Sequence, residues 1–182
     1  MGKNHRKSIR LKEYDYSSEG EYFITVVTHN RENLFGAISD GTMVLNDFGE
    51  IVRFTWHDLV NHNGNIELDE FVIMPNHVHG IVAIVGAGSK PGPADDSFRA
   101  GRGPAPTMND IDQKVELSEI VRQFKAFSAK RINKLRGISG IEVWQRGYYD
   151  HIIRSEKDYE AICNYIVENP QNWENDEESK LL

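Results

Sequence analysis

The residues of this chain best placed to do chemistry begin with two histidines, His77 and His79, in a run rich in β-branched residues. Side chains two residues apart on a strand point to the same face, so both imidazoles would project together while Val78 points into the core. Imidazole is a common ligand of transition metals, and a two-histidine site leaves coordination positions open for substrate oxygens. The pair therefore predicts half of a metal site, although many His-x-His pairs on protein surfaces bind nothing.

A second pair of polar residues, Tyr165 and Asn169, lies near the end of the last expected helix. Because they are four residues apart, they would share one face of that helix, one turn from each other. At about 100° per residue, Tyr165 falls roughly 130° from the centre of the apolar stripe. The stripe is formed by Tyr159, Ile162, Cys163, Ile166 and Val167. A hydroxyl and an amide oxygen would thus project together. The alternative is that Tyr165 packs at a margin of the sheet and Asn169 only caps the helix before Pro170.

A tyrosine hydroxyl and a divalent metal together can break a phosphodiester bond. The pKa of a tyrosine hydroxyl is ordinarily about 10, so at neutral pH it attacks phosphorus only with assistance. A bound divalent ion would assist by polarising the phosphate, neutralising charge and aligning the reacting atoms. The covalent phosphotyrosine keeps the energy of the broken bond, so that strands can be rejoined without ATP. Strand transfer, rather than simple hydrolysis, is the chemical advantage of such a set of residues.

Strands and helices in alternation must position these residues. Two β-prone runs separated by Pro75-Asn76 predict paired antiparallel strands, and the second run carries the histidines. Ser155 and Asp158 form a capping signal for the last helix. The expected elements are a strand at 21–28, a helix at 44–61, strands at 66–74 and 77–85, a helix at 116–136, a strand within 143–154 and a helix at 155–170. This order, β-α-β-β-α-β-α, predicts an α+β fold, a ferredoxin-like sandwich of an antiparallel sheet with helices packed on it.

The composition fits a single catalytic domain over residues 1–182. Of its 182 residues, 39% are hydrophobic, which is enough to bury one core. A stretch at about 86–110 holds four of the six prolines and predicts a flexible insertion, and an acidic tail occupies about 171–182. Cys163 is the only cysteine, so we expect no intramolecular disulfide and a cytoplasmic protein. The longest apolar run, Ile81 to Val85, is too short to span a bilayer, and no membrane partner is expected.

The distribution of charge matters more than its sum. A formal net charge of −7 argues against a nucleic-acid partner, because phosphate contacts need Lys and Arg. However, five basic and no acidic residues lie between Lys3 and Lys12, and six basic and no acidic residues lie between Arg122 and Arg136. The second segment falls on the polar side of the helix expected at 116–136, which makes that side a candidate DNA-facing surface. Either segment alone could equally be an ordinary solvated face.

Three ordered blocks of the sequence resemble the single-tyrosine HUH transposases of insertion sequences, and most closely the REP-associated tyrosine transposases of bacteria. The blocks are Phe71-Val-Ile-Met-Pro-Asn-His-Val-His-Gly80, Trp144-Gln-Arg-Gly-Tyr-Tyr-Asp-His-Ile-Ile-Arg154 and Asn164-Tyr-Ile-Val-Glu-Asn-Pro170. The resemblance covers most of the chain, from the first strand to Pro170. Its specificity comes from the order of the three blocks and not from His-x-His alone.

The resemblance implies a ferredoxin-like catalytic fold that acts on single-stranded DNA, usually near a hairpin, with Mg²⁺ or Mn²⁺. By position, His77 and His79 match the metal-binding pair, Tyr165 matches the nucleophile, and Asn169 matches a third polar ligand. The phosphotyrosine would form on the 5′ side of the nick and free a 3′ hydroxyl. Related transposases act as monomers or as dimers, so a homodimer is compatible with the resemblance.

DNA contacts are expected from the basic helix and from the block that begins at Trp144. The residues expected to take part are Arg122, Lys125, Lys130, Arg131, Lys134, Trp144, Arg146 and Tyr148, with bases stacking on Trp144 or Tyr148. Tyr148 and Tyr149 are adjacent, so a strand would point them to opposite faces, and at most one could share the metal face. The insertion, the acidic tail and the net charge are unlike a strongly basic transposase, and they bear on affinity and activity more than on the fold.

Two other functions are compatible with the sequence. One is a domesticated protein that binds structured single-stranded DNA without cutting it, which covalent trapping on a labelled hairpin would distinguish from the enzyme. The other is a small metal-dependent phosphodiesterase that uses the two histidines with water. Histidine-triad hydrolases would have a further histidine two residues beyond His79, where Ile81 stands. The sequence also lacks a glycine cradle for nucleotide phosphates, which makes ATP use an unfavoured alternative.

Overall fold

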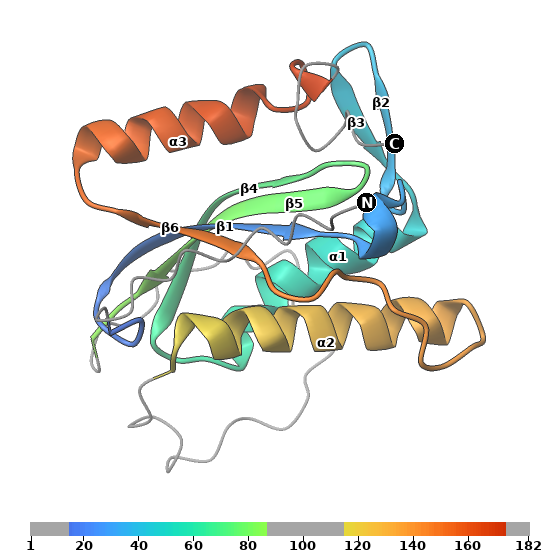
Figure 1. Cartoon of the computed structure of the whole chain (residues 1–182), viewed down its shortest axis with the longest axis horizontal. Coiled ribbons are helices and arrows are strands. Elements are labelled where there is room, and N and C mark those ends of the chain that lie inside the picture. Colours follow the sequence, from blue (N-terminus) through green and yellow to red (C-terminus); the bar gives the residue numbers. More distant parts are fainter. Residues whose placement is uncertain (1–14, 87–114, 174–182) are drawn as a thin grey trace, which may run out of the picture.

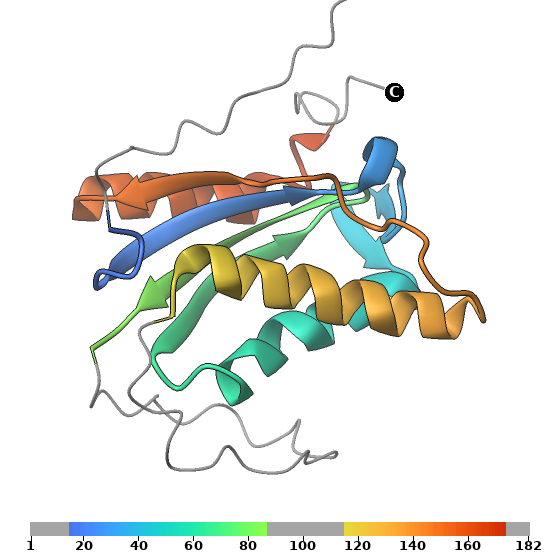
Figure 2. The same ribbon diagram turned by 60° about the horizontal axis from the view of Figure 1, so that its bottom comes forward.

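Four strands form one antiparallel sheet in the order β4-β5-β1-β6, as described by a computed structural model that covers residues 15–86 and 115–173. The strands are β1 (Gly20–Val27), β4 (Ile66–Ile73), β5 (His77–Ile84) and β6 (Tyr149–Ile153). The helices are α1 (Asp47–Asp58), α2 (Leu117–Leu135) and α3 (Glu156–Glu168). Helices α1 and α2 lie side by side on one face of the sheet, and α3 covers the other face (Figures 1 and 2).

This arrangement confirms the predicted α+β, ferredoxin-like sandwich. The first and third strands of the β-α-β-β-α-β unit, β1 and β5, are central, while β4 and β6 are at the edges. The last helix, α3, adds a layer that turns the two-layer unit into three layers (Figure 1). Its start is as predicted, since the Ser155 side chain accepts a hydrogen bond from the backbone N–H of Asp158.

A small hairpin precedes the first helix, and the prediction of a helix from residue 44 was wrong there. Strands β2 (Gly36–Ser39) and β3 (Thr42–Leu45) pair with each other, and α1 begins only after them. Asp40 and Gly41 both have positive φ, 50° and 71°, as a two-residue hairpin turn of this hand requires. The side chain of Asn46 then caps α1 by accepting from two backbone N–H groups. The predicted helix therefore began within β3 and ran through the cap residue.

The register of the sheet places one row of residues under α3. Thr25 of β1 pairs with His79 of β5 on one side and with Tyr149 of β6 on the other. Val72 of β4 pairs with His79 and completes the row. Because residues alternate along each strand, this row faces α3, while Val78 on the opposite face belongs to the main core, as predicted.

The sheet separates two apolar cores of different size. The larger core lies between the sheet and α1 and α2, and the smaller one lies under α3 around Phe23, Ile81, Ile153 and Ile166. On the larger side, Trp56 of α1 stacks on Phe71 of β4, with ring centroids 4.4 Å apart and an angle of 5° between the rings. This aromatic pair lies against Gly80, where an added Cβ would come within 2.6 Å of the Trp56 ring. The backbone that follows His79 thus rests directly on an aromatic ring.

Some predicted features lie outside the described residues. These are most of the flexible insertion at about 86–110, the acidic tail beyond residue 173 and the basic segment between Lys3 and Lys12. Within the parts of the chain that the structure describes, none of the helices combines the length and apolar character needed to cross a bilayer.

Candidate active site

The two histidines project from the start of β5 toward α3, and their rings meet. Nε2 of His77 lies 2.9 Å from Nε2 of His79. Both side chains are almost completely buried, at 0% and 2% exposure. The alternation of β5 therefore brings the pair to one face, as the spacing predicted, and directs the same nitrogen of each ring to one point.

Tyr165 of α3 reaches this point from the other layer. Its hydroxyl lies 3.2 Å from Nε2 of His79, and its ring centroid lies 5.1 Å from that of the imidazole. Tyr165 keeps 45% of its surface exposed, so a ligand can approach this side chain from solvent. The helix and the strand thus unite the tyrosine and the histidines that were predicted separately. The apolar stripe differs in one position, because Val167 is exposed and Ile166 alone of α3 is fully buried.

Asn169 follows α3 between two residues that contact the histidine pair. Tyr165, Asn169 and Trp173 follow each other at intervals of four residues, and hydrogen bonds such as Asn172 N–H to the Glu168 carbonyl, at 3.1 Å, continue the turns past α3. Tyr165 contacts His79, and the Trp173 ring lies 6.0 Å from that of His77. Asn169 falls between these two contacts. It is only 3% exposed, and its Oδ1 atom is buried without a hydrogen-bond partner among the described residues.

A buried oxygen without a partner costs free energy, about 1–3 kcal/mol in typical cases. Asn169 Oδ1 is therefore an acceptor that a cation or a donor group would satisfy. Asn169 is the C-cap residue of α3, as the alternative predicted, and its backbone N–H donates to the Ile166 carbonyl, but its side-chain oxygen has no donor among the described residues. Since the residues one turn before and one turn after it contact His79 and His77, a ligand at the histidine pair is a candidate partner for this oxygen.

A buried amide fixes which nitrogen of His77 faces the site. Asn76 donates from Nδ2 to the backbone carbonyl of Arg31 at 3.3 Å, which turns its Oδ1 toward Nδ1 of His77 at 2.8 Å. An amide oxygen only accepts, so Nδ1 of His77 carries the proton and donates. Nε2 of His77 is then the unprotonated nitrogen, with its lone pair directed at the site.

The position of the proton on His79 follows from that on His77. His79 Nε2 must donate to the lone pair of His77 Nε2, so in this arrangement His79 carries its proton there. Its Nδ1 accepts from the hydroxyl of Thr25 at 2.9 Å. Thr25 can also accept, because a hydroxyl rotates between the two roles. A ligand that needs the lone pair of His79 Nε2 would move the proton to Nδ1 and make Thr25 the acceptor.

The surroundings keep both rings neutral. Burial, together with a smaller contribution from the positive charge of Arg31, lowers the pKa of His77 to about 3. Burial also lowers the pKa of His79 well below its ordinary value, with a second contribution from His77. Arg31 and its neighbour Asn30 are both held at positive φ, 58° and 54°, a backbone strained for residues with a side chain. At neutral pH, both imidazoles are therefore available as neutral ligands.

The donor atoms fit a small divalent cation. Two metal–nitrogen bonds of about 2.1 Å at a right angle would place the nitrogens about 3.0 Å apart, close to the 2.9 Å between the two Nε2 atoms. Asn169 would add a neutral oxygen. In the described ranges, 15–86 and 115–173, no group of three or more His, Cys, Asp or Glu side chains could hold a metal. A cation at this point would thus rely on two imidazoles, an amide and oxygens from solvent or substrate.

The basic helix lies on the far side of the sheet from this site, because α2 packs beside α1 and the histidines face α3 (Figure 2). Several of its predicted DNA-binding residues hold the fold together. Arg131 pairs with Asp58 of α1 at 2.6 Å and donates to Thr55 at 3.0 Å. Lys125 donates to the carbonyls of Gln145 and Gly147 at 2.6 and 2.9 Å, and burial lowers its pKa.

The remaining predicted cations are at the surface. Arg122 pairs with Glu119 one turn before it. Lys130 and Lys134 of α2 and Arg146, in the loop before β6, have exposed side chains. Lys130, Lys134 and Arg146 are therefore the predicted cations that the surface leaves open to a phosphate.

Trp144 was expected to stack bases, and the structure corrects this. It is 7% exposed, its ring packs against Phe35 and Phe124, and its Nε1–H donates to Ser128 at 2.9 Å. Both faces and the polar edge of the indole are thus occupied by the core. Tyr148 is half-buried against the same core. Tyr149, its neighbour, is the member of the pair that shares the histidine face.

Several residues of the site were not predicted as such. Thr25 and Phe23 of β1 support His79, through the Nδ1 hydrogen bond and a stacked contact at 5.4 Å between ring centroids. Their two-residue spacing resembles that of the histidines, but only the register of β1 with β5 shows that they lie beneath it. Trp173 likewise joins the site through a long-range contact with His77, and Asn76, the neighbour of His77, is oriented by its long-range hydrogen bond to the Arg31 carbonyl.

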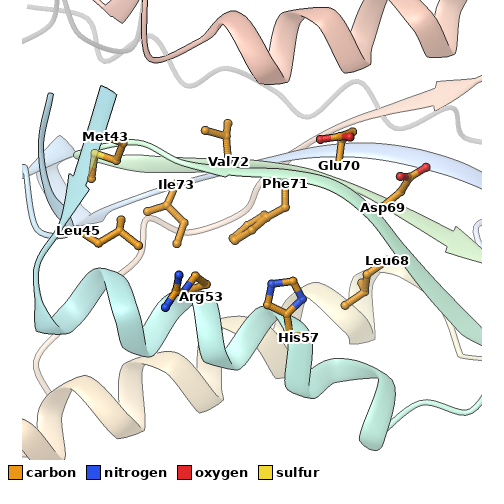
Figure 3. Close-up of a pocket in the computed structure, with 10 residues that line it drawn as sticks. All are labelled: Met43, Leu45, Arg53, His57, Leu68, Asp69, Glu70, Phe71, Val72 and Ile73. Carbon is orange, nitrogen blue, oxygen red and sulfur yellow. The ribbon is translucent and has the colours of Figure 1, made fainter. Parts of the chain in front are cut away.

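A hollow of about 450 Å³ lies elsewhere, along the free edge of β4 (Figure 3). It is lined by consecutive residues from Leu68 to Ile73 together with side chains of α1 and β3, among them Arg53 and His57. None of the four residues predicted for the chemistry lines it. The candidate active site is thus separate from this hollow, at a meeting point of buried imidazoles and a half-exposed phenol.

Comparison with solved structures identifies the class of fold. The chain aligns with the structure of a REP-associated tyrosine transposase bound to a REP hairpin, with a TM-score of 0.53 and 20% identity. The alignment covers 87% of this chain and 70% of the other. The chain therefore has a transposase-like fold. No protein-family model matches it.

Comparison of sequences identifies the family. A protein of Haemophilus influenzae (strain ATCC 51907 / DSM 11121 / KW20 / Rd), described as uncharacterized, is 43% identical over 176 residues, which cover 97% of this chain and 94% of that protein. The chain belongs to the same family as this Haemophilus protein.

Proposed function

We propose that the chain is a metal-dependent single-stranded DNA endonuclease and strand-transferase of the transposase type, which nicks DNA near a hairpin through a covalent bond to Tyr165. The observation that carries the proposal is the contact between the Tyr165 hydroxyl and Nε2 of His79, at 3.2 Å, beside a second imidazole nitrogen 2.9 Å further on. A metal-dependent phosphotyrosine enzyme needs neutral ligands for its cation close to the nucleophile, and two buried neutral imidazoles beside a half-exposed phenol meet this need.

His77, His79 and Asn169 would hold Mg²⁺ or Mn²⁺. When bound, such an ion would polarise the phosphate and offset the charge that develops on it. The chain orients its own ligands for this purpose: Asn76 keeps the lone pair of His77 directed at the site, and Thr25 can accept from Nδ1 of His79 once its Nε2 becomes a ligand. Asn169 contributes the buried oxygen that otherwise has no partner among the described residues.

Tyr165 performs the covalent step in this proposal. Its oxygen attacks the phosphorus, the bond from phosphorus to the 3′ oxygen breaks, and a phosphotyrosine forms on the 5′ side of the nick. The phenol proton leaves to solvent and the departing 3′ oxygen takes one up, so that a free 3′ hydroxyl results. Reversal with another 3′ hydroxyl joins two strands without an external source of energy.

The similar solved structure supports a DNA partner, since that transposase is bound to a REP hairpin. The described surface of this chain adds a constraint. Lys130 and Lys134 are exposed on α2, across the sheet from Tyr165. If these lysines bind DNA phosphates, the phosphates belong to a part of the DNA remote from the nick. The stem of a hairpin next to the nicked single strand would be such a part.

Covalent trapping tests the proposal. Labelled single-stranded DNA that carries hairpins is incubated with the protein and Mn²⁺, and adducts are separated under denaturing conditions. We expect an adduct with the wild-type chain, and none with Tyr165→Phe, with His77→Ala or in the presence of a chelator. Tyr159→Phe, which changes a tyrosine of the same helix whose hydroxyl bonds to Asp69 instead, is the matched control and is expected to keep the adduct.

The outcomes separate the alternatives. An adduct that persists in Tyr165→Phe would show that another residue is the nucleophile. Hairpin binding without any metal-dependent adduct would favour the DNA-binding protein that does not cut. Cleavage by wild type without a covalent species would point to hydrolysis by water at the histidine pair.

A further inference from the structure

Tyr149 is an exposed aromatic residue beside the candidate active site that the proposed chemistry does not use. It is the first residue of the edge strand β6, and 56% of its surface is exposed. Thr25 pairs with it across the sheet, and Thr25 also pairs with His79 and bonds to it. The backbone register therefore places Tyr149 at the level of His79, two strands away on the same face.

Phe23 links Tyr149 to the reacting groups. Its ring centroid lies 6.4 Å from that of Tyr149, 6.1 Å from that of Tyr165 and 5.4 Å from that of His79. Both tyrosine rings meet Phe23 edge to face, at 70° and 80°. Phe23 is itself buried. Two half-exposed phenols are thus held on one buried ring, and one of them is the proposed nucleophile.

Packing against the core does not explain the exposed ring. The neighbouring residue, Tyr148, takes the side of the main core, whereas Tyr149 leaves more than half of a large aromatic surface in water. Such a ring on a rigid strand is a preorganised surface for another flat ring, because aromatic side chains lose little conformational freedom on contact. An unpaired nucleobase is the flat ring that a single strand would bring to this place.

We propose that Tyr149 stacks on one unpaired nucleobase of the single strand, close to the phosphate that Tyr165 attacks, and so positions that phosphate over the histidine pair. The inference rests on the proposed function for the identity of the ligand, and on the sheet register and the shared Phe23 contact for its place. Stacking of one base on an aromatic side chain typically changes affinity by about 10- to 100-fold. It is tolerant of sequence, because every base has a flat face.

The test uses 2-aminopurine, a fluorescent base whose emission falls when it stacks. Hairpin-bearing single strands carry it at one position at a time, and binding is measured with Tyr165→Phe protein so that the strand stays intact. We expect strong quenching at one position only. In Tyr149→Val, which keeps a good strand-forming residue, we expect loss of that quenching and affinity lower by about 10- to 100-fold. Tyr149→Phe should restore both, since stacking needs the ring and not the hydroxyl.

Phe54→Ala provides the matched control, because Phe54 is also an exposed aromatic but lies on α1, across the sheet. It should leave quenching and affinity unchanged. Unaltered quenching in Tyr149→Val, failure of Tyr149→Phe to restore it, or the absence of DNA binding by the parent protein would each overturn the inference. Thermal unfolding of each variant shows whether the fold is retained.

The covalent assay keeps this inference separate from the proposed function. If wild type forms the Tyr165 adduct while quenching is the same in Tyr149→Val, the proposed stacking on Tyr149 is wrong and the proposed nicking activity is supported. If quenching depends on Tyr149 but no adduct forms with the wild-type chain, the stacking is supported and the nicking activity is not.

Discussion

The amide oxygen of Asn76 accepts a hydrogen bond from Nδ1 of His77 at 2.8 Å, so the nitrogen that His77 directs at the site is the unprotonated one. The same amide donates to the carbonyl of Arg31 at 3.3 Å, in the strained turn after β1. One buried side chain thus orients a proposed metal ligand and fixes the turn beside it.

Replacement of Asn76 should therefore weaken both the metal site and the fold. In Asn76→Ala, the buried Nδ1–H of His77 and the Arg31 carbonyl lose their partner, so we expect the free energy of unfolding to fall by about 1–3 kcal/mol. Because the orientation of the imidazole is lost, affinity for Mn²⁺ should fall by about 10- to 100-fold. Urea denaturation and titration calorimetry measure the two effects. Asn76→Asp keeps the acceptor for His77 and should retain more Mn²⁺ affinity than Asn76→Ala; equal affinities would contradict the orienting role.

Asn169→Ala should separate metal binding from stability. The substitution removes a buried oxygen that has no partner among the described residues, so the metal-free protein should change in stability by less than about 1 kcal/mol. Affinity for Mn²⁺ should nevertheless fall by on the order of 10-fold or more, because one proposed ligand is gone. Quenching of Trp173 fluorescence by Mn²⁺, read as the difference from Trp173→Phe, reports binding close to His77. Asn172→Ala, at the exposed surface nearby, is the control. Equal Mn²⁺ affinity in Asn169→Ala and wild type would remove Asn169 from the site.

Trp144→Phe should affect the core and leave DNA binding unchanged. The indole N–H donates to Ser128 within the core, and a phenyl ring lacks this donor, so we expect a loss of about 1–2 kcal/mol in the free energy of unfolding. The folded variant should bind hairpin DNA with the affinity of wild type, because the ring that changes is buried. Filter binding at a temperature well below unfolding checks this. A large loss of affinity in fully folded Trp144→Phe would restore the stacking role that its burial argues against.

The buried histidines should make the metal-free protein sensitive to acid. Unfolding returns the pKa of His77 from about 3 to its ordinary value of about 6.5, so below that pH the unfolded chain binds a proton that the folded chain does not. Stability present above about pH 6.5 is therefore lost progressively as the pH falls toward 3, by up to about 1.4 kcal/mol per pH unit for one such group. His79 acts in the same direction.

Chemical denaturation from pH 7 to pH 4.5, with a chelator present, measures this dependence. His77→Gln removes one of the two groups while leaving the carboxylates unchanged, so its stability should fall less steeply with acid than that of wild type. Parallel curves for the two proteins would mean that His77 does not titrate differently in the folded and unfolded chain.

Local periodicity was sufficient to predict most of the fold and the parts of the site. The two-residue spacing of His77 and His79 on a strand, and the four-residue spacing of Tyr165 and Asn169 on a helix, each specify a face without any knowledge of the rest of the chain. The contact between the two faces depends on how α3 packs on the sheet, which no local pattern encodes. The resemblance to a known family supplied that link before the structure did.

A charge pattern in the sequence does not show which groups each charged side chain contacts in the fold, and the expected DNA-binding surface is an example. The sequence shows that Lys125 and Arg131 lie on the polar side of a helix, but not which groups stand opposite them. Helix α2 packs beside α1 and the loop before β6, which brings Asp58 to Arg131 and two backbone carbonyls to Lys125. Both cations therefore stabilise the fold through these contacts. Tyr149 was passed over for a similar reason, because only the register of β6 with β1 shows which of two adjacent tyrosines faces the histidines.

Gly80 connects the site to the opposite side of the molecule. Immediately after His79, the strand lies so close to the Trp56 ring that even one added carbon would come within 2.6 Å of it. Trp56 is in turn stacked on Phe71, so the strand cannot settle toward α1 without displacing a stiff pair of rings. The stacked pair thus limits how far the strand that carries His77 and His79 can move toward the main core. Substitutions of Trp56 that leave the chain folded should therefore alter which cation the proposed metal site prefers, even though no atom of this residue belongs to that site.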